Sequence, residues 1–308
     1  MDFEQFIEMV KNEVKKKVGN DYSVSVKCVL KINRELQALS ILHNGSKYAP
    51  SIYLEDFFKE YKNGKAICDI ASEIVMISKQ RKKDTAFILE NIRNFDWVKP
   101  KLRVKLINYQ KNEKLLRTIP HEKYLDLAII PYVLISKENG NLMTTRVLYS
   151  LIAQWNISEE LLLKQAKDNT IQRSPVIIEK MADFILCAML KEIEAESDSE
   201  ELFRTILNKD SSRIEMYILT NENNLEGAFP AFNTDKLAEL SDRIGIDKLY
   251  ILPSSIHEII AVPAVEINPD KLKEIVKEVN RTQVREEDFL SDAVYHYSRM
   301  SNQISIVV

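Results

Sequence analysis

The stretch Tyr250-Ile-Leu-Pro-Ser-Ser-Ile-His-Glu-Ile-Ile-Ala-Val-Pro263 is the most regular pattern in the sequence. Two apolar segments rich in isoleucine, leucine and valine flank a tight polar break at Ser254 and Ser255. Such runs around a break predict a strand, a turn and a second strand. His257 and Glu258 follow the break, so the motif places two titratable side chains beside a turn.

Two structural interpretations apply to the residues around His257. If residues 256–262 form a strand, His257 and Glu258 point to opposite faces, because strand side chains alternate. Ser255 and His257 then share a face, but such neighbours seldom reach the geometry of a serine nucleophile and its base. Alternatively, Ser255-Ile-His-Glu258 has the form of a capping box ahead of a strand at 259–262. In both interpretations the serines have a structural role. The candidate catalytic residues of the motif are Ser254, Ser255 and His257.

Upstream of this motif, the N-terminal third predicts the order α-β-β-α-α. Residues 2–18 carry apolar side chains at three- and four-residue spacing and end at Gly19, as an amphipathic helix does. Residues 22–43 predict a hairpin that turns at Asn33-Arg34. Two helical segments follow, and the second begins after Gly64.

The remaining residues mix strands and helices without a fixed repeat. Strands are predicted at 102–107, 125–135, 213–220, 227–231 and 248–252, and helices at 143–155, from Ser158, from Pro175, at 234–244, from Asn268 and at 285–298. Residues 125–135 are nearly all apolar, which predicts a central strand. Pro131 cannot donate to a strand ladder, so we expect a bulge or an edge there.

The mixed order of elements favours an α+β fold over a doubly wound one. We expect mixed, mainly antiparallel sheets with hairpins, packed by amphipathic helices. The expected regions are 1–97, 98–208 and 209–308, of which the last two can form one continuous domain. The acidic stretch Glu192–Glu201 predicts a mobile segment or a boundary between them.

Composition limits the class of protein. The chain has 308 residues, 45% of them hydrophobic, and a net charge of −3, which suits a sizeable core and speaks against a strongly basic nucleic-acid binder. Its 6 glycines speak against Rossmann and P-loop sites, which use glycine where backbone approaches phosphate. The three cysteines, Cys28, Cys68 and Cys187, are too widely spaced for a zinc or disulfide framework. We therefore expect neither a metal nor a cofactor.

Targeting signals are not evident in the sequence. The start, Met1-Asp-Phe-Glu-Gln-Phe6, has neither the basic nor the apolar region of a secretory signal. No run approaches the length of a membrane helix, about 18 apolar residues. We expect a soluble, cytoplasmic protein with no membrane partner.

Histidines and acids supply few other candidate sites. The four histidines include no pair at the spacing of a zinc-binding helix. Asp126 lies in the most apolar predicted strand, where burial would raise its pKa and suit it to act as a base or a ligand. An acid near a strand start is also commonly solvated or paired, and this interpretation stands beside the first.

Several short strings occur in an order that resembles a known family. They are Pro50-Ser-Ile-Tyr-Leu-Glu-Asp56, Gly64 with its following helix, Leu106-Ile-Asn-Tyr-Gln-Lys-Asn-Glu113, Tyr124-Leu-Asp-Leu-Ala-Ile-Ile-Pro-Tyr132, Trp155-Asn-Ile-Ser-Glu-Glu160, Ala166-Lys-Asp-Asn-Thr170 and Leu252-Pro-Ser-Ser-Ile-His-Glu258. Nearly the whole chain resembles a bacterial family known only as a domain of unknown function, common in anaerobic gut-type bacteria. The resemblance implies a bacterial cytoplasmic protein of mixed α/β build, and it implies no activity and no catalytic residues.

Three functional hypotheses follow from the sequence. The first is a binding or regulatory module without catalysis, acting on a protein partner, because no complete catalytic signature is present. The second is a hydrolase with its site near His257, which predicts that His257 lines a pocket close to another acid such as Asp126. The third is a nucleic-acid-associated protein that uses the basic stretches 79–85 and 99–105, although the acidic net charge speaks against it.

Overall fold

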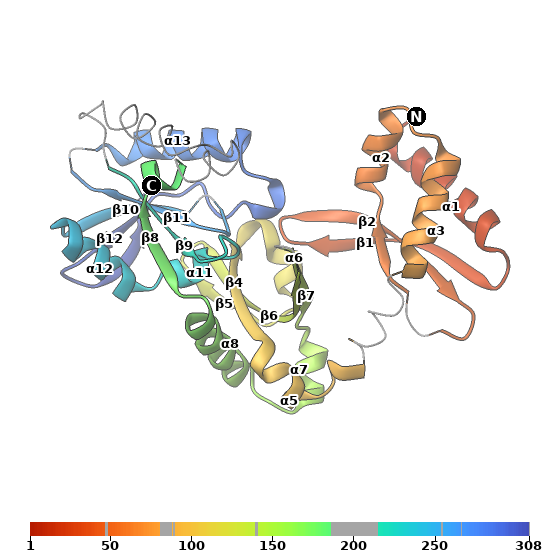
Figure 1. Cartoon of the computed structure of the whole chain (residues 1–308), viewed down its shortest axis with the longest axis horizontal. Coiled ribbons are helices and arrows are strands. Elements are labelled where there is room, and N and C mark those ends of the chain that lie inside the picture. The colour runs from red at the N-terminus through yellow and green to blue at the C-terminus, as the bar shows by residue number, and fades with distance from the viewer. Residues whose placement is uncertain are drawn as a thin grey trace, which may run out of the picture. The chain divides into compact units, whose positions relative to one another are not determined.

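A computed structural model of the chain describes residues 1–46, 49–80, 88, 90–138, 141–185, 215–253, 255–265 and 267–307. The chain divides into two compact units, Met1–Lys99 and Pro100–Val308 (Figure 1). Each unit has a hydrophobic core of its own. Within the described residues, no helix is both long and apolar enough to cross a membrane.

The N-terminal unit is a three-stranded antiparallel sheet packed by helices. Its elements are α1 (Phe3–Val18), β1 (Tyr22–Lys31), β2 (Arg34–His43), β3 (Ser51–Tyr53), α2 (Glu55–Lys62) and α3 (Ile67–Gln80). The strand order is β1-β2-β3. The predicted hairpin is confirmed with its turn between β1 and β2, and the short strand β3 adds a third member to the sheet.

Local sequence explains the boundaries and the core of this unit. Asp2 accepts a hydrogen bond from the backbone N–H of Gln5 and forms a capping box that starts α1, and Gly19 ends the helix at a φ of 79°. In the hairpin, Val26 lies opposite Leu39, and both contribute to the core that also contains side chains of α1 and α3. The alternation of β1 and β2 therefore sets the face that the helices cover.

The C-terminal unit contains two antiparallel sheets. The first consists of β4 (Leu102–Asn108), β5 (Glu122–Tyr124), β6 (Leu127–Glu138) and β7 (Asn141–Arg146), with β6 at its centre. Helix α8 (Glu159–Arg173) packs against β4, where the Thr170 hydroxyl accepts a hydrogen bond from the Val104 N–H at 2.9 Å. The short helix α5 (Phe95–Val98) ends the N-terminal unit, and the segment η1 (Lys99–Lys101) crosses the boundary between the units. The C-terminal unit also contains the short helical segments η2 (Gln110–Asn112), α6 (Glu113–Leu116) and α7 (Tyr149–Trp155).

Pro131 occupies a position in β6 where its missing N–H costs little. It lies opposite Val104 of β4, whose own N–H is donated to Thr170 rather than to β6. On the other side of β6, the β5 pairing stops at Ile129 and the β7 pairing starts at Tyr132. The irregularity that we expected at Pro131 lies a few residues later, between Leu134 and Ser136.

The second sheet has the order β13-β12-β10-β11-β9-β8. Its strands are β8 (Val176–Lys180), β9 (Tyr217–Asn221), β10 (Lys248–Leu252), β11 (Ile259–Pro263), β12 (Tyr295–Ser298) and β13 (Gln303–Ile306). Helix α13 (Pro269–Thr282) shares a core with one face through Leu272 and Val276. Helices α11 (Ala228–Ala231) and α12 (Thr234–Ile244) and the segment η3 (Glu286–Asp288) complete the unit. All strand pairings of the described residues are antiparallel, which confirms the α+β fold.

Four predicted elements were wrong. The helix predicted from residue 143 begins only at Tyr149, because residues 141–146 form β7. The helix expected from Pro175 is strand β8, followed by helical residues from Met181 onward. The expected strand at 227–231 is the short helix α11, and the final helix at 285–298 is η3 followed by strand β12. The acidic stretch at 192–201 lies outside the described residues.

Candidate functional site

Strands β10 and β11 are consecutive in the chain and pair antiparallel, so the motif Tyr250–Pro263 is a β-hairpin whose β10–β11 loop contains Ser255 and His257. Ser255 Oγ accepts a hydrogen bond from the His257 N–H at 3.0 Å, and Ser255 also forms an isolated bridge with Phe289. The predicted capping box is absent from this loop, because the serine bonds to residue 257 and no helical turn follows. Ser255 is buried, and Ser254 lies outside the described residues.

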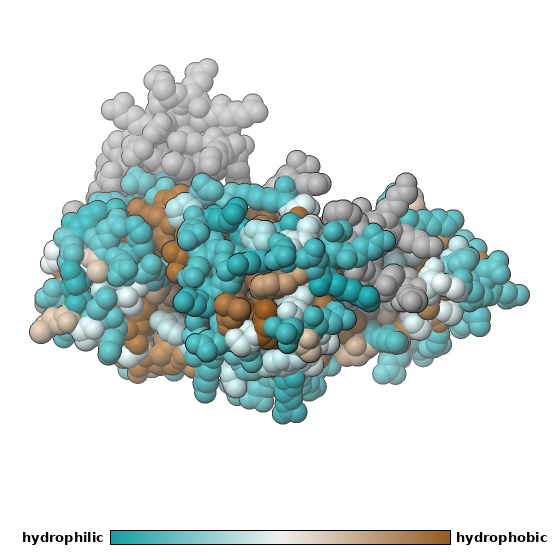
Figure 2. Space-filling model, turned by 90° about the horizontal axis from the view of Figure 1, so that it is seen from below, coloured by the Kyte–Doolittle hydropathy of each residue, from teal (hydrophilic) through white to brown (hydrophobic). Residues whose placement is uncertain are grey.

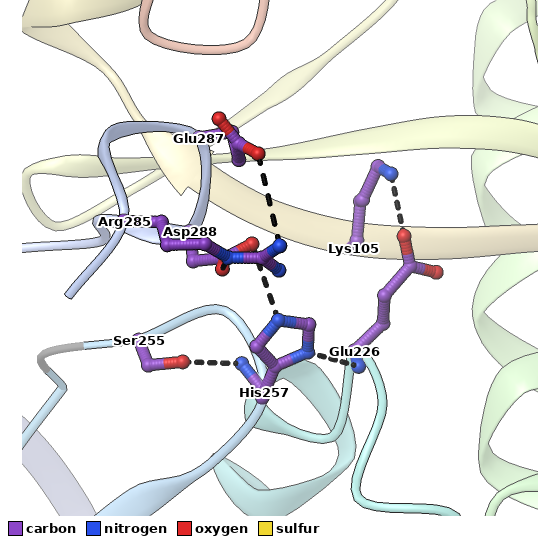
Figure 3. A network of polar contacts seen from close by, with 7 residues as sticks. All are labelled: Lys105, Glu226, Ser255, His257, Arg285, Glu287 and Asp288. Atoms are coloured by element: carbon purple, nitrogen blue, oxygen red, sulfur yellow. Dashed lines mark hydrogen bonds and ion pairs between the residues drawn. The ribbon is translucent and has the colours of Figure 1, made fainter. Parts of the chain in front are cut away.

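His257 is held at both ring nitrogens (Figure 3). Its Nε2 lies 3.2 Å from Asp288 Oδ1, and its Nδ1 accepts a hydrogen bond from the Glu226 N–H at 3.2 Å. These partners assign the ring proton to Nε2, because a neutral imidazole has one donor and one acceptor. The Arg285 Nε lies 2.6 Å from the other oxygen of Asp288 and completes the chain of contacts.

A buried ion pair continues this network toward the first sheet. Lys105 Nζ of β4 lies 2.5 Å from Glu226 Oε1, and both side chains are only 12% exposed. The same ammonium lies 4.8 Å from the ring centre of Tyr132 in β6. Burial, with the nearby charge of Glu226, raises the pKa of Tyr132 well above its ordinary value. The pair therefore links the loop before α11 to strand β4 of the first sheet.

Glu258 places a further acid beside His257. Burial raises the pKa of Glu258, and the charge of Asp288 acts in the same direction. His257 and a hydrogen bond with Ser255 oppose that rise. Two acids therefore interact electrostatically with His257, Glu258 from its own loop and Asp288 from η3.

Asp126 belongs to a separate cluster. Its carboxylate accepts a hydrogen bond from Ser291 Oγ at 2.6 Å and another from the Tyr295 hydroxyl. Burial and the charge of Asp126 raise the pKa of Tyr295 far above its ordinary value. The hydrolase hypothesis expected an acid such as Asp126 near His257; the acid in contact with the imidazole is Asp288, and Asp126 contacts Ser291 and Tyr295 instead.

Among the described residues of these two clusters, no serine hydroxyl is hydrogen-bonded to a histidine ring nitrogen. The His257 ring nitrogens face Asp288 and the Glu226 backbone, and Ser255 Oγ faces the His257 backbone. A serine hydrolase instead needs a serine hydroxyl within hydrogen-bond reach of a histidine nitrogen. The sequence does not predict Asp288 as the partner of His257, because the two residues are far apart in the chain and no spacing rule connects them. In the described part of the chain, no group of three His, Cys, Asp or Glu side chains is placed to hold a metal.

Two of the four cations in the basic stretch 99–105, Arg103 and Lys105, are turned inward, whereas Lys99 is exposed. Arg103 is buried, and its guanidinium donates to the carbonyl oxygens of Pro100 and Leu102 at 3.0 and 2.6 Å. Burial lowers the pKa of Arg103, with Arg173 adding to the effect. Lys105 is engaged by Glu226. The cations needed for phosphate contacts are therefore not presented by Arg103 and Lys105, and the stretch 79–85 lies mostly outside the described residues.

An apolar cavity of about 340 Å³ lies between the first sheet and the α11–α12 segment of the C-terminal unit. Its walls include Leu106, Tyr124, Ile129, Ile171, Phe229 and Phe232. The rings of Tyr124 and Phe232 meet edge to face, with centres 5.7 Å apart. Five separate elements or segments contribute these side chains, so no local pattern in the sequence could reveal the cavity.

The C-terminal unit is thus a two-sheet α+β structure with an internal polar network and an adjoining apolar cavity. The family model described as a family of unknown function, DUF5688, matches residues 3–299 of the chain. The protein belongs to this family, which confirms the resemblance to an uncharacterised family over nearly the whole chain. No curated protein matches the chain, and no solved structure does.

Proposed function

We propose that the protein is a non-catalytic binding module that holds a small, largely apolar ligand in the cavity beside α11. The cavity itself carries this proposal. Its volume of about 340 Å³ falls within the range of small-molecule sites, about 300–1,000 Å³. Aliphatic and aromatic side chains dominate its walls, as in most sites for small organic ligands.

The polar groups at the cavity favour an uncharged ligand. Burial raises the pKa of Tyr124, so its phenol stays neutral at physiological pH and can donate a hydrogen bond. Asn233 uses its side-chain oxygen to accept from the Asp235 N–H at 2.9 Å, where it caps α12. No charged side chain is among the residues that line the cavity. A ligand with an aromatic or branched aliphatic body fits these walls best.

On the face drawn in Figure 2, hydrophobic residues form separate patches interrupted by hydrophilic ones. Scattered apolar residues of this kind are ordinary on a protein surface and do not by themselves mark a docking site. His257, Asp126 and their partners do not line the cavity, which supports binding without chemistry at those residues. We propose that the protein functions in the bacterial cytoplasm.

Ile171→Trp tests the proposal, because Ile171 lines the cavity from α8 and is 48% exposed. The indole can enter the cavity from its rim without disturbing the buried core. We expect the full chain to bind N-phenyl-1-naphthylamine, a neutral apolar fluorophore, with enhanced emission. The variant should bind it at least about tenfold more weakly, equivalent to roughly 1.4 kcal/mol.

Leu161→Trp is the matched control, because Leu161 lies on the same helix, is 49% exposed and does not line the cavity. This variant should bind the fluorophore as the wild type does. The proposed site would be contradicted if the wild type did not bind the fluorophore, or if Ile171→Trp bound it as well as the wild type does.

A further inference from the structure

We propose that His257 is a positioning residue that anchors one wall of the ligand cavity, and that protonation of its ring weakens ligand binding. The inference rests on the proposed function of the cavity and adds its regulation. Phe229, Pro230 and Phe232 form that wall, on α11 and just after it. The residues immediately before α11 are the ones that His257 holds.

Three consecutive backbone N–H groups fix the start of α11 to the β10–β11 loop. The Glu226 N–H donates to His257 Nδ1 at 3.2 Å, and the Gly227 N–H donates to the His257 carbonyl at 2.9 Å. The Ala228 N–H donates to the Ile256 carbonyl at 3.2 Å. The imidazole accepts the first of these hydrogen bonds, and protonation of the ring would break that bond but not the other two.

The anchored segment has little room to adjust. A Cβ added at Gly227 would lie 2.5 Å from the His257 carbonyl oxygen and 2.6 Å from Thr220 Oγ1. Glu226 has a φ of 52°, a left-handed conformation that costs a non-glycine residue about 1 kcal/mol or more. The contacts with His257 therefore hold the segment in a conformation that the chain does not favour by itself.

Protonation of the His257 ring would place two hydrogen-bond donors, Nδ1–H and the Glu226 N–H, opposite each other. Nδ1 can accept a hydrogen bond only while the imidazole is neutral, and an added proton makes both nitrogens donors. The charged groups that face His257 are Asp288 from η3, with Arg285 bound to it, and Glu258 from the same loop. The Glu226 side chain is turned to Lys105. The imidazolium is thus attracted to the acids, while the wall loses the first of its three anchoring hydrogen bonds.

Binding of N-phenyl-1-naphthylamine to the full chain across pH tests this inference, because that probe stays neutral throughout. For the wild type, we expect an affinity that is roughly fivefold lower at about pH 5 than at about pH 8, because the loss of one hydrogen bond weakens binding by about that factor. His257→Asn offers an amide oxygen near the position of Nδ1 and does not titrate. It should keep wild-type affinity near neutral pH and lose the pH dependence.

His257→Leu lacks any acceptor and should bind the probe about fivefold more weakly at every pH. His296→Asn is the matched control, because His296 lies on β12, where burial and Lys248 lower its pKa, and it does not line the cavity. This variant should keep the wild-type pH profile. Thermal melting at each pH shows which variants are folded, and the asparagine variant decides the question if the leucine variant unfolds.

Wild-type binding that does not change with pH would overturn the inference while leaving the proposed cavity intact. A pH profile that persists in His257→Asn would overturn it as well, because another group would then titrate. Absence of probe binding near neutral pH would overturn the proposed function itself.

Discussion

His257 is surrounded by groups that compete for its proton and its hydrogen bonds. Asp288 accepts from Nε2, while the Glu226 backbone requires Nδ1 to stay unprotonated. Glu258 adds a half-buried acid with a raised pKa on the same loop. At the scale of single residues, titratable side chains of the C-terminal unit therefore cluster where the β10–β11 loop contacts the segment before α11.

Glu258→Gln is expected to stabilise the protein at neutral pH. The folded pKa of Glu258 lies above its unfolded value, so the folded chain holds this proton more tightly than the unfolded one. Its contribution to stability is fully present below the ordinary glutamate pKa, about 4.3, and is lost as pH rises through the raised value. Glutamine avoids the cost of ionising a buried carboxyl and can still hydrogen bond to Ser255.

Urea unfolding at several pH values measures this effect. The free energy of unfolding of Glu258→Gln should exceed that of the wild type near pH 7, and the difference should shrink toward about pH 4. Glu274→Gln, which changes a 74% exposed side chain on α13, should show little difference at either pH. A glutamine variant that is less stable than the wild type near pH 7 would show that the ionised carboxylate is favourable there.

The elements that the sequence predicted well are those whose signals are local. The β10–β11 and β1–β2 hairpins follow from apolar runs around polar breaks, and the caps Ser158 and Asn268 start α8 and α13 as expected. Strand β12 was mistaken for helix because its four residues are too short to show a period against nearby apolar residues. Its two tyrosines are fully buried by neighbouring strands and by Phe232, contacts that only the folded chain provides.

The candidate site was predicted only in part. His257 was singled out by its place after a turn, and it does occupy a polar network. Its partners Asp288 and Glu226 come from η3 and from the segment before α11, and no sequence spacing connects them. The cavity depends on the meeting of several elements, which apolar periodicity within any one of them does not determine.

Gly227→Ala tests the close contact between the start of α11 and strand β9. Gly227 has a φ of −81°, which alanine adopts freely, so any cost comes from the contacts of the new Cβ. That atom would meet the His257 carbonyl oxygen, Thr220 Oγ1 and the Asn221 N–H nitrogen at 2.8 Å or less. We expect a loss of about 3 kcal/mol in the free energy of unfolding, at the upper end for an overpacked site.

Gly245→Ala supplies the comparison within the same unit. Gly245 has a φ of 70° at the end of α12, and an added Cβ there meets nothing within 4 Å. Alanine should cost roughly 1–2 kcal/mol from backbone strain alone. Urea unfolding of both variants measures the difference, and a smaller loss at Gly227 than at Gly245 would mean that α11 moves freely.

At the scale of the whole chain, each unit has its own core, and the proposed ligand cavity belongs to the C-terminal unit. The N-terminal unit has a core built from α1, α3 and the inner faces of its strands. The C-terminal unit contains the polar network, the Asp126 cluster and the cavity. Isoleucines occur in both places, with Ile129 and Ile171 at the cavity and Ile70 and Ile74 in the N-terminal core. Their methyl groups can therefore report on ligand binding in each unit separately.

The most direct test of the cavity is methyl NMR on the full chain with labelled isoleucine and leucine, titrated with N-phenyl-1-naphthylamine. The aromatic rings of a ligand in the cavity should shift the methyl signals of Leu106, Ile129 and Ile171, while those of Ile70 and Ile74 stay unchanged. The account is contradicted if the cavity methyls do not move, or if the N-terminal methyls move in their place.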